Sequence, residues 1–188
     1  FFFPDPWTET TVSGPRILST LRQPIVQAVR DNAQDRIKLA SKVVLAAGFL
    51  ACARRESLAT YAHCFRESFK RRWFKVMFLD RLLADMFIRL WEKTRPDFAS
   101  LFLNAGAHIQ HHYLFNSKAY AGPSRNPSWY IPPQEDPVLD VFRLYDRILA
   151  EILNMAGTAR VMVATGLHQD PHERVTYYYR LKDHAGFL

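Results

Sequence analysis

The sequence lacks any apolar run long enough to cross a lipid bilayer. The longest, residues 43–53, is about half the ~20 residues that a transmembrane helix needs, and two arginines follow it. We therefore expect no membrane span. Cysteine is scarce as well. Cys52 and Cys64 are the two thiols, and free cysteine in helical sequence usually behaves as a small buried hydrophobe. Nothing in this pattern requires an oxidising compartment, so we expect a cytoplasmic location.

Internal repeats and low-complexity tracts are also absent, and 48% of the 188 residues are apolar. A chain of this length and composition can bury a substantial core. It begins with Phe1 rather than Met, and residues 183–188 read as the first turn of a helix with nothing after it. A single helical turn is unstable in water. The sequence is therefore expected to be a piece of a larger protein, cut at both ends.

Proline is missing between residues 33 and 95, and this stretch is predicted to be helical. Gly48 and residues 54–57 are the expected breaks, with Ser57 capping the next helix, and Pro96 ends the region. A shorter helix is expected after Ser13–Pro15, broken or restarted at Pro24. Apolar residues recur every three to four positions, as on one face of a helix: Ile37, Ala40, Val44, Ala47 and Leu50, then Phe65, Phe69, Phe74, Phe78, Leu82 and Phe87.

The pattern changes after residue 95. Residues 98–103 and 160–165 are short apolar runs typical of buried strands, and between them Asp136-Pro137 opens a helix that ends near Ala156-Gly157. Strand, helix and strand predict a βαβ unit, with residues 177–181 as a further strand. We therefore predict an α/β fold with a partial parallel sheet. Residues 1–95 would be an extended segment plus a large helical insertion, and residues 96–188 the sheet region.

Five of the seven histidines lie where the two predicted strands end, within residues 104–112 and 165–172. Ligands of parallel sheets bind beyond the carboxyl ends of the strands, and neutral imidazole is a common ligand for zinc and similar ions. On a helix starting near Ala107, His108 and His112 would share a face, with His111 beside them. The alternative is that these are ordinary polar residues covering a loop.

The run Pro96–His108 is similar to a segment of the nucleotide pyrophosphatase/phosphodiesterase-like members of the alkaline phosphatase superfamily, in which a strand ends in Asp-x-x-Gly-His. The helix at 140–153 and the strand at 161–165 resemble that family's next helix and the strand ending in Ser-Asp-His-Gly. The resemblance covers roughly residues 96–170. It implies two metal ions, held by aspartates and histidines, that activate a Thr or Ser nucleophile for attack on a phosphoester.

The sequence departs from that family pattern at two places. Asn104 stands where the family has its ligating Asp, and Thr165-Gly166-Leu167-His168 replaces Ser-Asp-His-Gly. A site with fewer carboxylates holds a divalent cation less strongly or uses other ligands. The candidate metal ligands are His108, His112 and His168, with zinc or manganese as the cofactor, and Asn104 and His111 are candidate substrate contacts. The nucleophile is expected upstream of Phe1.

These observations predict a fragment of a metal-dependent hydrolase of phosphate or sulfate esters. The parent is expected to be an enzyme acting on a small-molecule ester, and the piece alone to be inactive. The alternative is a catalytically degenerate member that binds anions or sugar phosphates. The net charge of +7 and the basic, aromatic stretch 66–75 permit a third function, nucleic-acid binding. We do not expect it, because aromatic residues at helical spacing form a core stripe with Lys and Arg on the solvated face.

The proline-rich loop at 116–137 carries Trp129 and Tyr130, with Arg125 nearby. Loops above strand ends often determine specificity, so these aromatics either contact a substrate or pack down as a lid.

Overall fold

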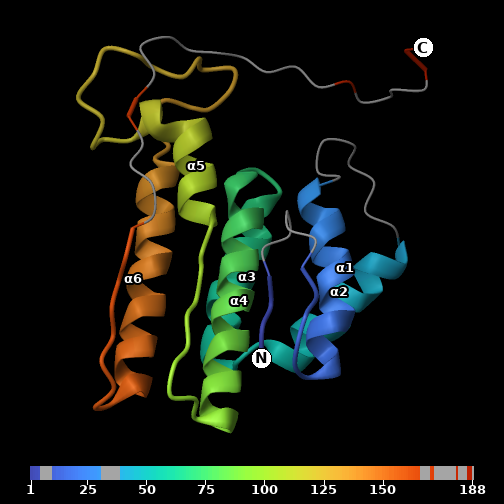
Figure 1. Ribbon diagram of the computed structural model, residues 1–188. Coiled ribbons are helices and arrows are strands. Elements are labelled where there is room, and N and C mark those ends of the chain that lie inside the picture. Colours follow the sequence, from blue (N-terminus) through green and yellow to red (C-terminus); the bar gives the residue numbers. More distant parts are fainter. Residues whose placement is uncertain (5–9, 31–38, 166–169, 172–180, 182–185, 188) are drawn as a thin grey trace. The chain divides into compact units, whose positions relative to one another are not determined.

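The computed structural model describes residues 1–4, 10–30, 39–165, 170–171, 181 and 186–187. In chain order its helical elements are α1 (Arg16–Arg30), α2 (Leu39–Cys52), the 3-10 helix η2 (Arg55–Ser57), α3 (Leu58–Ser68), α4 (Trp73–Thr94), α5 (Ala105–Tyr113), the 3-10 helix η3 (Leu114–Asn116) and α6 (Pro137–Ala156) (Figure 1). Residues 53–176 form one compact unit. Residues 1–52 form the other, together with the described residues beyond 176.

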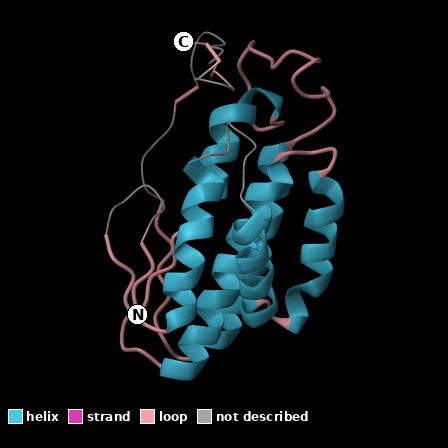
Figure 2. Ribbon diagram, turned by 90° about the vertical axis from the view of Figure 1, so that its right-hand side faces the viewer, coloured by secondary structure: helices cyan, strands magenta, loops and turns pink. Residues whose placement is uncertain are grey.

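The predicted parallel sheet is wrong for the residues that the structure describes. Their one β-type pairing is an isolated antiparallel bridge between Phe2 and Ser13, and Figure 2 shows helices and loops without a strand. Residues 98–103 and 160–165 are neither helix nor paired strand. The chain is therefore helical here rather than α/β, and the third expected strand, 177–181, lies outside the described residues except for Leu181.

The prediction of buried strands was wrong for a physical reason. A short apolar run fits any environment that buries it, and periodicity does not show what lies beside the backbone. Leu101 and Leu103 pack against the core of the helices around them, so their burial is achieved without a neighbouring strand.

The larger unit is built from α3, α4, α5 and α6. Helix α4 lies at its centre and contacts each of the other three. Its core contains, among others, Trp73, Phe74, Met77, Ala84, Ile109, Val141, Leu144 and Ile148. Helix α6 begins as the sequence predicts: Pro137 occupies the first turn and the Asp136 carboxylate accepts a hydrogen bond from the backbone N–H of Leu139. The expected boundary at residues 95/96 falls inside this unit.

The helical prediction for residues 33–95 is confirmed from Leu39 onward, with corrections at the breaks. The chain does leave the helix at residues 53–54, but Gly48 lies inside α2. A Cβ added there would approach the Leu21 side chain to 2.0 Å, so this glycine permits close packing of α1 on α2. A second break, at residues 69–72, was not predicted. Helix α4 ends as expected before Pro96, with Arg95 in a left-handed conformation (φ 44°).

Pro24 does not break the first helix, because α1 continues through it to Arg30. Leu18, Leu21 and Ile25 are buried on one face of α1. A proline inside a helix costs a hydrogen bond and creates a steric clash. Packing of this apolar face against α2 offsets that cost.

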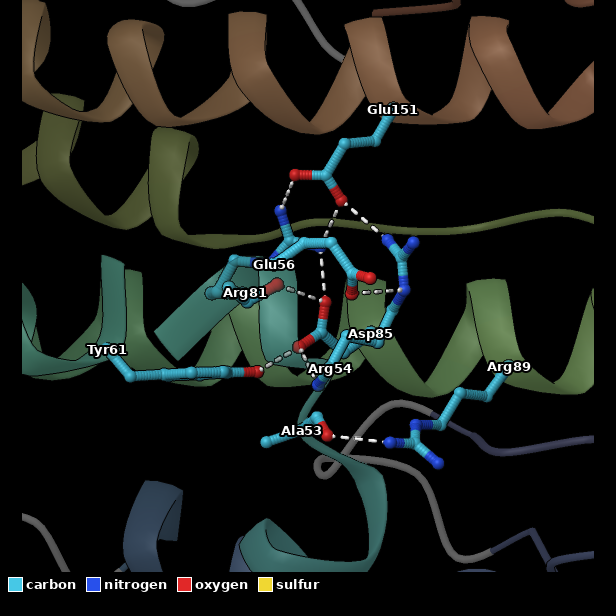
Figure 3. A network of polar contacts seen from close by, with 9 residues as sticks. Ala53, Arg54, Glu56, Tyr61, Arg81, Asp85, Arg89 and Glu151 are labelled. Atoms are coloured by element: carbon cyan, nitrogen blue, oxygen red, sulfur yellow. Dashed lines mark hydrogen bonds and ion pairs between the residues drawn. The ribbon is translucent and has the colours of Figure 1, made fainter. Parts of the chain in front are cut away.

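A buried ionic network joins α3, α4 and α6 (Figure 3). Asp85 is fully buried and Arg81 is 1% exposed. The Asp85 carboxylate pairs with the Arg81 guanidinium, and it accepts hydrogen bonds at 2.8 Å each from the Ser57 hydroxyl, the Tyr61 hydroxyl and the Arg54 backbone N–H. The Ser57 hydroxyl therefore donates to Asp85 and makes no cap for α3, so the predicted cap is wrong.

Glu151 of α6 completes this network by accepting from both Arg81 and Arg54 at 2.8–3.0 Å. With Glu56, which lies 3.7 Å from the Arg54 guanidinium, three carboxylates thus face two guanidinium groups. Burial alone would lower the pKa of Arg81, but the charges of Asp85 and Glu151 outweigh it and raise that pKa above its ordinary value.

We expect Asp85→Ala to destabilise the protein by about 3–5 kcal/mol, because it leaves three donors without their acceptor and the buried Arg81 guanidinium with Glu151 as its remaining acceptor. Urea unfolding followed by circular dichroism measures the loss. Asp97→Ala, at an exposed position, is the matched control and should change the free energy of unfolding little. A loss no larger than that of the control would show that the network does not hold the helices together.

Candidate functional site

The three neighbouring histidines lie on α5, which is short and close to α6. His108 and His112 are one turn apart, and the centroids of their rings are 4.8 Å from each other. His108 is half-buried, whereas His111 and His112 are exposed. The predicted face shared by His108 and His112 is therefore present.

The N-terminus of α5 is held by two side chains from other helices. The buried Asp80 of α4 accepts hydrogen bonds from the backbone N–H groups of Asn104 (3.4 Å) and Ala105 (2.8 Å). The Tyr145 hydroxyl of α6 donates to Asp80 and accepts from the N–H of Gly106, both at 2.7 Å. Backbone donors that the helix itself leaves unsatisfied are thus bound inside the protein.

Burial raises the pKa of the Asp80 carboxyl, although the hydrogen bonds from Tyr145, Ala105 and Asn104 restrain the rise. Gly106 leaves room for this arrangement, since a Cβ at that position would lie 2.9 Å from the Tyr145 ring. Two residues of the run that resembles a metal-binding motif, Asn104 and Gly106, therefore take part in positioning α5. The Asn104 residue itself is exposed, and its role in substrate binding remains a prediction.

We expect Tyr145→Phe to cost about 1–3 kcal/mol, because it removes one donor from the buried Asp80 and the acceptor for Gly106. Hydrogen exchange of the amides of residues 104–106 should accelerate, which amide NMR measures directly. Leu153→Ala, at a position of the same helix that is 51% exposed, is the control. Unchanged exchange in Tyr145→Phe would show that the hydroxyl does not hold the start of α5.

A cluster of packed aromatic side chains lies beside the histidines. Tyr130, from the proline-rich loop, stacks on Tyr113 of α5 with ring centroids 5.6 Å apart, and Trp73 packs on the same tyrosine at 5.3 Å. The Tyr130 hydroxyl lies 3.2 Å from Nδ1 of His112. Tyr130 thus packs against α5 although it is 40% exposed, whereas Trp129 is 73% exposed. Whether either residue contacts a substrate stays a prediction.

Electrostatics favour a neutral imidazole at His108. Its pKa is lowered, first by burial and then by the neighbouring His112 and His111. Arg72 places a positive charge close enough to lower the pKa values of Tyr113 and Tyr130, although burial leaves both raised. A neutral imidazole is the form that binds metal ions.

The structure brings together only some of the residues predicted for the site. His108 and His112 are adjacent and His111 follows within the same turn, but His168 lies outside the described residues. Among the residues that are described, no three histidines, cysteines or carboxylates cluster in a way that would hold a metal ion. Sequence reasoning did not identify Asp80 and Tyr145 as the residues that fix α5, since both occur within helical sequence without a motif.

A cavity of about 710 Å³ borders another face of α5. Gln110 and Leu114 line it on the α5 side and Val138 and Phe142 on the α6 side. Residues 117, 119–124 and 171 form the rest of the lining. The Tyr120 ring packs on Phe115, with ring centroids 5.1 Å apart. Cζ of Arg125 lies 5.7 Å from the centroid of the same ring. The lining is largely apolar.

No family model, curated protein or solved structure matches the chain. Any functional assignment therefore rests on these side chains and on the resemblance described above. In the part of the chain that the structure describes, none of the helices is long and apolar enough to cross a membrane.

We expect His108 to titrate below the ordinary pKa of histidine in an NMR pH titration. His112→Ala should raise that pKa only partway, because burial is the larger cause and remains. Because the pKa of His108 is lowered in the folded protein, the unfolded chain binds this imidazole proton more tightly. The free energy of unfolding should therefore fall as the pH drops through the ordinary pKa of histidine toward that of folded His108. His63→Ala on α3 is the control. An unchanged His108 titration in His112→Ala would show that the two imidazoles do not interact.

Proposed function

We propose that this chain binds a divalent transition metal through His108 and His112 and takes part in metal-dependent hydrolysis of phosphate or sulfate esters. The observation that carries the proposal is the pair of imidazoles on successive turns of α5, 4.8 Å apart. Two histidines at i and i+4 on one helix are a known arrangement for zinc. The ester class comes from the sequence resemblance to the alkaline phosphatase superfamily alone, because the strands that carry these motifs in that family are absent from the described residues.

The state of each imidazole supports metal binding. The lowered pKa of His108 keeps protons from competing with a metal at neutral pH. At His112, the Tyr130 hydroxyl faces Nδ1, so a metal ion would be bound through Nε2. A hydrogen-bond partner on the second ring nitrogen commonly fixes the orientation of a metal-bound histidine.

Two imidazoles do not complete a zinc site, which needs three or four ligands. We propose His168 as the third protein ligand. When bound, the metal would act as a Lewis acid on the ester and lower the pKa of a coordinated water. The positive charge of Arg72 acts on Tyr113 and Tyr130 beside the histidines, and it would favour an anionic ester.

The test is zinc and manganese binding to the 188-residue chain by isothermal titration calorimetry. Metal should bind to the unmodified chain, and His108→Ala/His112→Ala should abolish binding. His168→Ala should weaken it. His63→Ala removes an imidazole from α3 and should leave it unchanged. Tyr130→Phe should weaken binding about 10–100-fold if the hydroxyl orients His112.

Hydrolysis of bis(p-nitrophenyl) phosphate and p-nitrophenyl sulfate is measured on the full-length protein with and without the same substitutions, because the 188 residues alone are expected to be inactive. Metal-dependent turnover that is lost in the double variant would support the full proposal. Unchanged metal content in that variant would refute the ligand assignment.

A second candidate is an anion- or sugar-phosphate-binding module without catalysis. The absence of carboxylates from the histidine cluster in the described residues favours it, because fewer anionic ligands weaken metal binding. Binding of a sugar phosphate without added metal, and without turnover, would select this candidate.

A further inference from the structure

Residues 98–103 form an extended segment with one face against the helices and the other exposed. Ala99, Leu101 and Leu103 are partly buried, and the two leucines pack on the core. The alternate positions are exposed, with Phe98 at 84% and Phe102 at 68%. A repeat of two is the periodicity of a β-strand. The segment thus has the side-chain pattern of a strand, and Figure 1 shows it drawn between α4 and α6.

The main chain of this segment has no hydrogen-bonding partner among the residues that the structure describes. Backbone bonds outside the regular helices end with Arg95 on one side and resume at Asn104 on the other. An extended backbone with free N–H and C=O groups is a template for another strand. The partner that fits is therefore an extended chain, which would add through backbone hydrogen bonds.

The order of side chains identifies which strand fits. The sequence Phe98-Ala99-Ser100-Leu101-Phe102 reads nearly the same in both directions about its centre. In an antiparallel pair, directly opposite residues point to the same face of the sheet. If two copies of the segment align with Ser100 opposite Ser100, each Phe98 faces a Phe102 of the other copy. Aromatic cross-strand pairs of this kind stabilise antiparallel strands.

We propose that residues 98–102 are a self-association surface, at which two copies of this chain pair as antiparallel strands across a two-fold axis at Ser100. The interface is isologous, since the same patch is used on both copies. It would satisfy the exposed backbone groups and partly cover both phenylalanines. The other extended segment, 160–165, is a poorer candidate because Met162 and Val163, neighbours in sequence, are both exposed, so it has no single buried face.

The register gives a direct test. A residue opposite its own copy has a Cα–Cα separation of about 4.5–5.5 Å, within the range of a disulfide. Under mild oxidation, Ser100→Cys should form a covalent dimer of twice the chain mass on a non-reducing gel. Ser128→Cys, at another exposed serine, is the matched control. The unmodified chain gives the background from Cys52 and Cys64, which are buried.

Sedimentation velocity supplies the second measurement. The unmodified chain should sediment as a dimer, and Phe98→Lys/Phe102→Lys as a monomer with an unchanged circular dichroism spectrum. Leu139→Lys, an exposed apolar position on α6, should remain dimeric. A monomeric unmodified chain, or a Ser100→Cys variant that cross-links no faster than Ser128→Cys, would overturn the proposal. If the double variant does not fold, the Ser100→Cys comparison still decides.

Discussion

Helix α4 buries two carboxylates, Asp80 and Asp85, and the arrangement of the larger unit follows from the need to satisfy them. A buried carboxylate without partners is strongly unfavourable, so donors must converge on each one. Asp85 takes its donors from Arg81 on its own helix and from the chain just before and within α3. Asp80 takes its donors from the start of α5 and from α6. One helix thereby fixes the positions of the other three.

The same constraint reaches the candidate site. Because Asp80 and Tyr145 bind the first backbone N–H groups of α5, the helix start is fixed relative to α4 and α6. The histidines then follow one turn later, and Tyr130 and Tyr113 support the end of the helix on which His112 lies. The pair His108 and His112 is therefore presented by a short helix that is held at both ends.

Helices alone do not satisfy every segment of this unit. Residues 98–103 pack one face against the core and leave the other face exposed, and their backbone has no hydrogen-bonding partner among the described residues. That combination is a liability in a monomer, because an exposed edge pairs with other chains. A protein can use such an edge as an interface.

Much of the local structure follows from the sequence by itself. Asp136-Pro137 determines where α6 begins, and Arg95-Pro96 determines where α4 ends. The apolar spacing predicts that α2, α3 and α4 are helices. All of these signals depend only on neighbours along the chain. The step from His108 to His112 likewise places both on one face of a helix. Tertiary structure decided three other features: the partners of Asp80 and Asp85, the continuation of α1 through Pro24, and the unpaired state of residues 98–103. Each depends on what another segment places beside the residue, and the burial energy of such contacts outweighs local preference.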